Sequence, residues 1–138
     1  MHIAIINGPN LNLLGTREPE VYGSQTFELY LKELKNKFPA IKFSYFQSNI
    51  EGELIDFVQK MNLESDGIIL NAAAYTHTSI GLGDAISAIK TPVIEVHISN
   101  IYAREEYRHH SYLTGKCAGV ISGLGLKGYE LAIHYFNK

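Results

Sequence analysis

Apolar residues follow two different spacings along this chain. Short runs, such as the one at 3–6, have the length of buried strands. Longer stretches repeat apolar residues every three or four positions, which is the period of a helix with one buried face. The pattern predicts strands at 3–6, 41–45, 68–70, 93–98 and 118–121, and helices at 27–38, 50–61, 80–89 and 126–136.

Capping residues support three of the predicted helix starts. Thr26 precedes the first helix, and either Thr78 or Ser79 can cap the third. Ser48, with Glu51 three residues later, forms a capping-box pattern before the second helix.

Strands that alternate with helices predict a parallel α/β sheet joined by right-handed crossovers. We expect one domain over 1–138, with the doubly wound strand order 2-1-3-4-5 and the half-polar strand 41–45 at an edge. In such sheets ligands bind beyond the carboxyl ends of the strands, where the strand order reverses. Residues 7–10, Asn71 and His97 follow strands one, three and four, so we expect them around one crevice.

Charge and composition favour a small-molecule role. The net charge is −2 and the 12 basic residues are scattered, which gives no electrostatic footprint for nucleic acid or an anionic membrane. The single Cys117 excludes an intramolecular disulfide and fits a reducing compartment. The N-terminal apolar run is too short for a signal-peptide core, and no segment approaches the roughly 20 apolar residues that span a bilayer. We therefore expect a cytoplasmic protein.

Three common uses of such a sheet do not fit these residues. Pro9 removes an amide donor from a turn without a glycine-rich phosphate cradle, which argues against nucleotide binding. The first strand ends in Asn7-Gly8, without the acidic residues of a phosphoacceptor receiver. The six histidines are scattered, and His109-His110 lack a third ligand nearby, so we expect no metal site.

The segment 16–24 carries Arg17 and Tyr22 between glycines that can act as hinges. It has the character of a mobile lid, although an ordinary surface loop has a similar composition. Together with amides, a histidine and a further arginine around the crevice, it suits proton transfer on an oxygen-rich organic substrate.

Several separated motifs closely resemble those of type II 3-dehydroquinases, the 3-dehydroquinate dehydratases of flavodoxin-like three-layer fold. They cover essentially the whole chain, and together they are far more specific than any one alone. No functional position departs from the family pattern. The motifs are NGPNLNLLG at 7–15, REPEVYG at 17–23, NAAAYTHTS at 71–79, EVHISN at 95–100 and the later Arg108.

The resemblance implies catalytic roles for four residues, and the strand geometry adds a fifth, Glu95. Tyr22 would remove the proton beside the ketone with help from Arg17, and Asn10 would hold the water that stabilises the enolate oxygen. His97 matches the proton donor to the departing hydroxyl. Glu95 lies two residues earlier on the same strand face, where a carboxylate favours the charged form of His97. From the residues alone, a lid-packing tyrosine, a turn-forming asparagine and a structural histidine stay open as alternatives.

The resemblance also implies a substrate-binding set. The side chains of Asn71, His77 and Arg108 would bind hydroxyl groups, and the amides of Ile98 and Ser99 would bind the carboxylate. A plain solvated side chain is the alternative for Arg108.

Asp84 matches a family position that reaches the site from a neighbouring subunit, in trimers that assemble to a dodecamer. From the sequence alone it is a charge in a helix of small residues, for which solvation is the ordinary role. The implied reaction needs no cofactor and serves the shikimate pathway of aromatic amino acid biosynthesis, or quinate breakdown. A non-catalytic binding module that keeps the pocket is the competing hypothesis, and the intact Tyr22, Arg17 and His97 argue against it.

Overall fold

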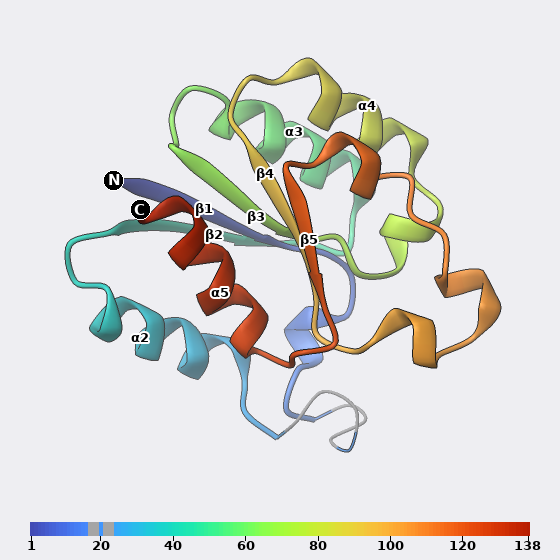
Figure 1. Cartoon of the computed structure of the whole chain (residues 1–138), viewed down its shortest axis with the longest axis horizontal. Coiled ribbons are helices and arrows are strands. Elements are labelled where there is room, and N and C mark those ends of the chain that lie inside the picture. The colour runs from blue at the N-terminus through green and yellow to red at the C-terminus, as the bar shows by residue number, and fades with distance from the viewer. Residues whose placement is uncertain (17–19, 21–23) are drawn as a thin grey trace.

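The computed structural model describes residues 1–16, 20 and 24–138. Its five strands are parallel and form one sheet in the order β2-β1-β3-β4-β5, as predicted (Figure 1). The strands are β1 (His2–Asn7), β2 (Lys42–Gln47), β3 (Gly67–Asn71), β4 (Val93–His97) and β5 (Gly119–Ser122). The four predicted helices are α2 (Phe27–Lys37), α3 (Glu51–Met61), α4 (Ile80–Ala88) and α5 (Lys127–Phe136).

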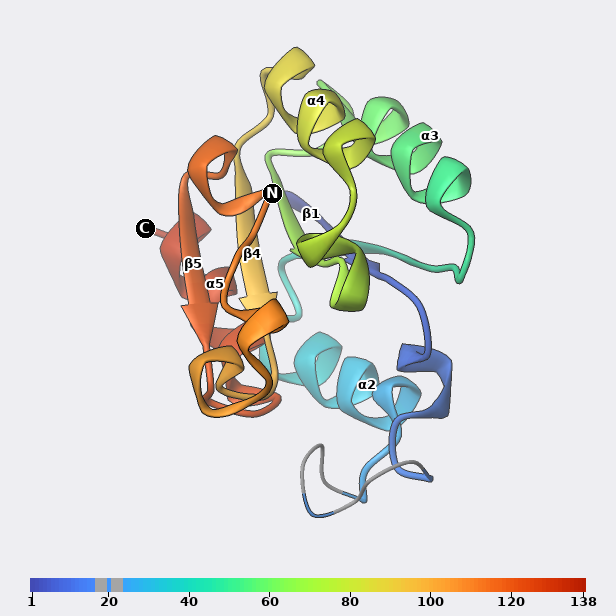
Figure 2. The same ribbon diagram turned by 90° about the vertical axis from the view of Figure 1, so that its right-hand side faces the viewer.

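Helices cover both faces of the sheet, which gives three layers (Figures 1 and 2). Alternate residues of β1 show why: Ile3 and Ile5 pack with the apolar side chains of α2 and α5. Ala4 and Ile6 point the other way and pack with those of α3 and α4. Because both faces are covered, the central strands are apolar at nearly every position.

The predicted caps are confirmed at two helices. Thr26 accepts a hydrogen bond from the Leu29 amide at the start of α2, and Ser79 caps α4 in the same way. The capping box predicted for α3 is wrong. Ser48 lies two residues before the N-cap Ile50, accepts from the Ile50 amide and donates to Glu53. It therefore shapes the turn that enters α3 rather than pairing with Glu51.

The loops after β1 and β3 touch at the carboxyl edge of the sheet. The Gly8 amide donates to the Asn71 carbonyl at 2.7 Å. A Cβ at Gly8 would lie only 2.5 Å from the Ala72 carbonyl oxygen, so only glycine permits this approach. Asn10 and Ala73 both have left-handed backbone conformations, with φ of 69° and 51°. The two loops therefore form one connected edge.

Five short 3₁₀ helices lie in the connections of the described chain. A 3₁₀ turn of three to five residues is too short to show an apolar period, so the spacing of apolar residues does not predict these turns. They are η1 (Leu11–Leu13), η2 (Ala73–His77), η3 (Ile101–Ala103), η4 (Glu106–Arg108) and η5 (Thr114–Lys116). Within the described ranges, no helix has both the length and the apolar character needed to cross a bilayer.

Candidate active site

A pocket opens beyond the carboxyl ends of β1, β3 and β4, where the strand order reverses. Its walls come from η1, η2 and the chain that follows β4. Seven of the predicted site residues line it: Asn10, Asn71, His77, His97, Ile98, Ser99 and Arg108. The fold thus gathers residues that are up to a hundred positions apart in the sequence.

Four predicted site residues do not line this pocket as described. Arg17 and Tyr22 lie outside the described residues. Asp84 is exposed on α4 and is not part of the pocket wall formed by its own chain. Glu95 lies beneath the pocket and has no exposed surface.

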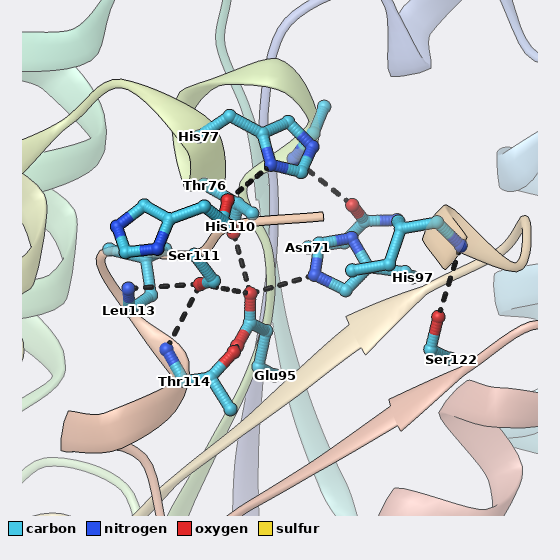
Figure 3. A network of polar contacts seen from close by, with 12 residues as sticks. Asn71, Thr76, His77, Glu95, His97, His110, Ser111, Leu113, Thr114 and Ser122 are labelled. Carbon is cyan, nitrogen blue, oxygen red and sulfur yellow. Dashed lines mark hydrogen bonds and ion pairs between the residues drawn. The ribbon is translucent and has the colours of Figure 1, made fainter. Parts of the chain in front are cut away.

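Four donors surround the buried Glu95 carboxylate (Figure 3). Oε1 accepts from Thr76 at 2.6 Å, from His97 Nε2 at 2.7 Å and from Ser111 at 3.1 Å. Oε2 accepts from the Thr114 hydroxyl. Burial by itself raises the pKa of Glu95, but the hydrogen bond and charge of His97 and the hydrogen bonds from Thr114 and Thr76 bring the pKa below its ordinary value. Glu95 is therefore a carboxylate at neutral pH.

The Glu95 carboxylate fixes the orientation of the His97 ring. A carboxylate can only accept, so Nε2 of His97 carries a proton and donates it to Glu95. The other ring nitrogen, Nδ1, is then the one available to the pocket that His97 lines.

His77 is held by a different kind of acceptor. One of its ring nitrogens, Nδ1, lies 2.7 Å from the His110 carbonyl oxygen. Burial lowers the pKa of His77, the contact with His110 opposes this, and the charges of His97 and Arg108 lower the pKa further. The net direction is down, so His77 is neutral at pH 7, with a proton on Nδ1 and a free lone pair on Nε2.

Asn71 belongs to a buried chain of polar side chains. Its Oδ1 accepts from the Ala73 amide at 3.1 Å, so Nδ2 must be the atom that donates to the Tyr129 hydroxyl at 2.9 Å. Tyr129 in turn donates to Asn7 Oδ1 at 2.8 Å, and Asn7 Nδ2 donates to the Tyr45 hydroxyl at 3.4 Å. One N–H of Asn71 remains for a ligand.

Two arginines line the pocket, one of which sequence reasoning missed. Arg104 lies four residues before Arg108, and its Nη1 is 3.5 Å from the Ser99 hydroxyl. Arg108 pairs through Nε with the Glu105 carboxylate. Arg104 follows η3 and Arg108 ends η4, and the backbone at Arg104 and Glu105 between these two turns is extended. No helical spacing therefore linked the two arginines in the sequence.

The hydroxyl groups around Glu95 were also missed. Thr76, Ser111 and Thr114 are common residue types without a motif of their own. The signal was Glu95 itself, because a carboxylate in a buried strand requires donors from elsewhere in the chain. Within residues 1–16, 20 and 24–138, no group of three or more His, Cys, Asp or Glu side chains is arranged to hold a metal ion.

Comparison with known proteins identifies the family. The family model described as dehydroquinase class II matches residues 1–137. A 3-dehydroquinate dehydratase from Bordetella avium is 53% identical over 137 residues, which are 96% of this chain and 94% of that protein. One from an Exiguobacterium species is also 53% identical, over 97% of this chain and 92% of that protein.

Solved structures agree with this match. The crystal structure of type II dehydroquinase from Butyrivibrio crossotus superposes with a TM-score of 0.96 at 43% identity, covering 100% of this chain and 98% of that one. The enzyme from Propionibacterium acnes gives a TM-score of 0.94 at 38% identity, covering 99% and 97%. The chain therefore belongs to the class II dehydroquinase family.

Proposed function

We propose that this chain is a hydro-lyase that dehydrates 3-dehydroquinate to 3-dehydroshikimate. The observation that carries the proposal is the Glu95–His97 pair at the base of a polar pocket, in a chain of this family. The reaction serves the shikimate pathway or quinate breakdown, in the cytoplasm.

The proposed reaction is an anti elimination through an enolate. Tyr22, assisted by Arg17, takes the proton from the carbon beside the ketone, and the electron pair moves onto the ketone oxygen. A water held by Asn10 stabilises the resulting enolate. When the ketone reforms, a carbon–carbon double bond appears and the β-hydroxyl departs as water with a proton from His97. The roles of Tyr22 and Arg17 rest on the sequence resemblance.

The geometry around His97 supports its role as the proton donor. A donor at Nδ1 must start as the imidazolium, and the Glu95 carboxylate 2.7 Å from Nε2 offsets that positive charge. After the proton leaves, the neutral ring keeps its Nε2–H bond to Glu95. The proton can therefore be delivered without a rotation of the ring.

The other pocket groups match a polyhydroxylated carboxylic acid. Nε2 of His77 can accept from a hydroxyl, and Asn71 can donate one N–H. The chain at Ile98 and Ser99 supplies amides for the carboxylate, and Arg108 supplies a cation for a hydroxyl. We also propose that the segment 16–24 is a lid over this pocket and that residues 1–138 act as one domain.

We propose that Asp84 completes the site of a neighbouring subunit, in trimers that form a dodecamer. Its exposure on α4 supports this, because a side chain that serves another subunit must be accessible on its own.

One assay tests the proposed function against the alternative, a non-catalytic binding module. Purified protein is incubated with 3-dehydroquinate, and the ultraviolet absorbance of the enone product is followed. We expect the absorbance to rise with enzyme concentration. Binding of 3-dehydroquinate without any rise would establish the binding module instead.

A second experiment tests the enolate against a lysine Schiff base. No lysine lines the pocket formed by the described residues, which supports a route without a covalent link. We expect that borohydride added with substrate neither inactivates the enzyme nor adds substrate mass to it. A reduced adduct on a lysine, found by mass spectrometry with parallel loss of activity, would overturn the enolate route.

A further inference from the structure

We propose that Ser111 is a positioning residue through which one buried carboxylate, Glu95, orients both pocket histidines. His97 is oriented directly, and His77 is oriented through the 110–114 segment, the five residues that precede and begin η5. The kinetic part of this proposal rests on the proposed function, whereas the structural part does not.

The direction of each hydrogen bond at Ser111 is determined by its partners. Its oxygen accepts from the Leu113 amide at 3.0 Å and from the Thr114 amide at 3.0 Å. Both lone pairs are then used, so the hydroxyl proton is directed to Glu95 Oε1, 3.1 Å away (Figure 3). Ser111 thus joins a turn of the backbone to the carboxylate.

Two further contacts fix this segment beside η2, the element that carries His77. The Thr114 hydroxyl donates to Glu95, and the Tyr112 amide donates to the Thr76 carbonyl at 2.9 Å. Thr76 itself donates to Glu95 through its side chain. The side chain of Leu113 is fully buried in the core. The segment therefore has one position relative to both β4 and η2.

That position determines where the His110 carbonyl lies, and hence which nitrogen of His77 is protonated. The carbonyl can only accept, so its contact at 2.7 Å requires a proton on Nδ1. The two rings, 6.3 Å apart and nearly parallel at 19°, thus donate to the protein through different nitrogens, Nδ1 of His77 and Nε2 of His97, and hold opposite tautomers whenever both are neutral. His77 presents an acceptor, Nε2, to the pocket, while His97 presents Nδ1.

As a consequence, the two histidines have different roles, His77 as an acceptor for substrate and His97 as a proton donor, and the role of His77 depends on Ser111. If the His110 carbonyl moves away, His77 can carry its proton on Nε2 and becomes a donor where the proposed substrate hydroxyl needs an acceptor. The Glu95–His97 pair keeps the donors Thr76 and Thr114 in that case. Loss of Ser111 should therefore weaken substrate binding more than proton transfer.

The tautomers can be measured without any assay of activity. Two-bond ¹H–¹⁵N spectra of protein labelled with ¹⁵N-histidine, recorded at a pH where both rings are neutral, distinguish protonated Nδ1 from protonated Nε2. His77→Gln and His97→Gln variants assign the two signals. In the wild type we expect a proton on Nδ1 of His77 and on Nε2 of His97.

Ser111→Ala should shift His77 toward the Nε2-protonated tautomer and leave that of His97 unchanged. It should also raise KM about tenfold, the size of one mispaired hydrogen bond, with a much smaller change in kcat. A purely structural role would lower kcat through loss of folded enzyme and leave KM and the tautomers unchanged. Ser111→Thr, which keeps the hydroxyl, should restore both values. Tyr112→Phe, in the same segment, is the matched control and should change neither.

An unchanged His77 tautomer in folded Ser111→Ala would overturn the proposal, as would a wild-type His77 protonated on Nε2. Should Ser111→Ala fail to fold, Ser111→Cys keeps the shape with weaker hydrogen bonds, and the same spectra apply. Wild-type protein that shows the expected tautomers but no dehydration would contradict the proposed function and leave the structural inference standing.

Discussion

The charge of Glu95 can be removed with little change in shape. In Glu95→Gln the amide oxygen can replace Oε1, and the amide nitrogen can donate to Thr114, whose hydroxyl then accepts. What is lost is the negative charge beside His97, worth about 1.5–3 kcal/mol as a charge-assisted hydrogen bond. We therefore expect kcat to fall about tenfold to a hundredfold with KM little changed, in steady-state kinetics of protein with wild-type circular dichroism. A kcat within twofold of wild type would contradict the role given to the carboxylate.

Tyr22→Phe tests the proposed base. The change removes a proton acceptor and very little surface, so turnover should be nearly abolished while substrate affinity, measured by calorimetry, stays close to that of the wild type. Bringing a phenol of pKa about 10 to its anion at pH 7 costs about 4 kcal/mol, which a cation ~4 Å away at intermediate dielectric offsets. Turnover close to normal in Tyr22→Phe would rule out this base.

Individual site residues were predictable where a motif carried them, but their partners were not. Asn71 was expected at the pocket and lies there. Its partner Tyr129 is 58 residues away, on a helix whose pattern indicates only an apolar face. Hydrogen bonds at such separation depend on how helices dock, which no local pattern encodes.

Between helices, a carboxylate on α5 links two elements of the same layer. Glu130 lies 2.5 Å from Lys37 of α2 and 2.8 Å from Lys127 of its own helix. The hydrogen bonds and charges of these two lysines lower the pKa of Glu130 from 4.5 to about 2. A carboxylate with a depressed pKa stabilises the fold above its unfolded-state pKa, and loses that contribution as the pH falls toward the folded value.

Glu130→Gln should therefore destabilise the protein at pH 7 and have progressively less effect between pH 4.5 and about 2. Because both lysines are more than half exposed, we expect a loss of no more than about 1 kcal/mol at neutral pH. Denaturant unfolding of the wild type and of Glu130→Gln, from pH 7 down to about 2, measures this difference in the free energy of unfolding. Glu28→Gln, an exposed glutamate on α2, is the control. A difference that grows as the pH falls would contradict the pairing.

The strands and helices were predicted well because the spacing of apolar residues and the length of each apolar segment distinguish strands from helices. Each of the nine predicted elements is present, and their ends differ by only a few residues. The errors came from short-range hydrogen bonding. Ser48 donates a hydrogen bond to Glu53 and does not pair with Glu51, because the chain turns before α3 begins. The 3₁₀ turns are too short to show a repeat of apolar residues.

At the scale of the assembly, the proposal that subunits share a site can be tested by mixing two variants. We expect Asp84→Ala and Tyr22→Phe each to impair every site that contains the altered residue. If Asp84 serves a neighbour, subunits of the two variants co-assembled in one oligomer should regain some activity, because some sites then receive both intact residues. Verified mixed oligomers without any regained activity would count against the shared site. Oligomers of wild-type and Tyr22→Phe subunits are the reference for the activity of a mixed oligomer.

The topology could be deduced because few arrangements of alternating strands and helices satisfy right-handed crossovers with both faces covered. The same rule located the pocket at the reversal of strand order. The wall of the pocket could not be deduced in the same way. It depends on the close approach of Gly8 to Ala72 and on the left-handed Ala73, which are set by contacts between loops.

The hydrogen-bond chain from Asn71 through Tyr129 and Asn7 to Tyr45 runs in one direction only, because the Ala73 amide fixes its first member. Its members come from β3, α5, β1 and β2. This hydrogen-bond chain therefore makes four distant parts of the sequence depend on one another, so that a change in one requires a matching change in the others. A chimera that takes α5 from a protein without a hydroxyl at position 129 would leave the buried side-chain amides of Asn71 and Asn7 without a hydrogen-bond partner, however well the apolar face of the new helix fits. Anyone recombining this chain with a relative should move these four side chains together.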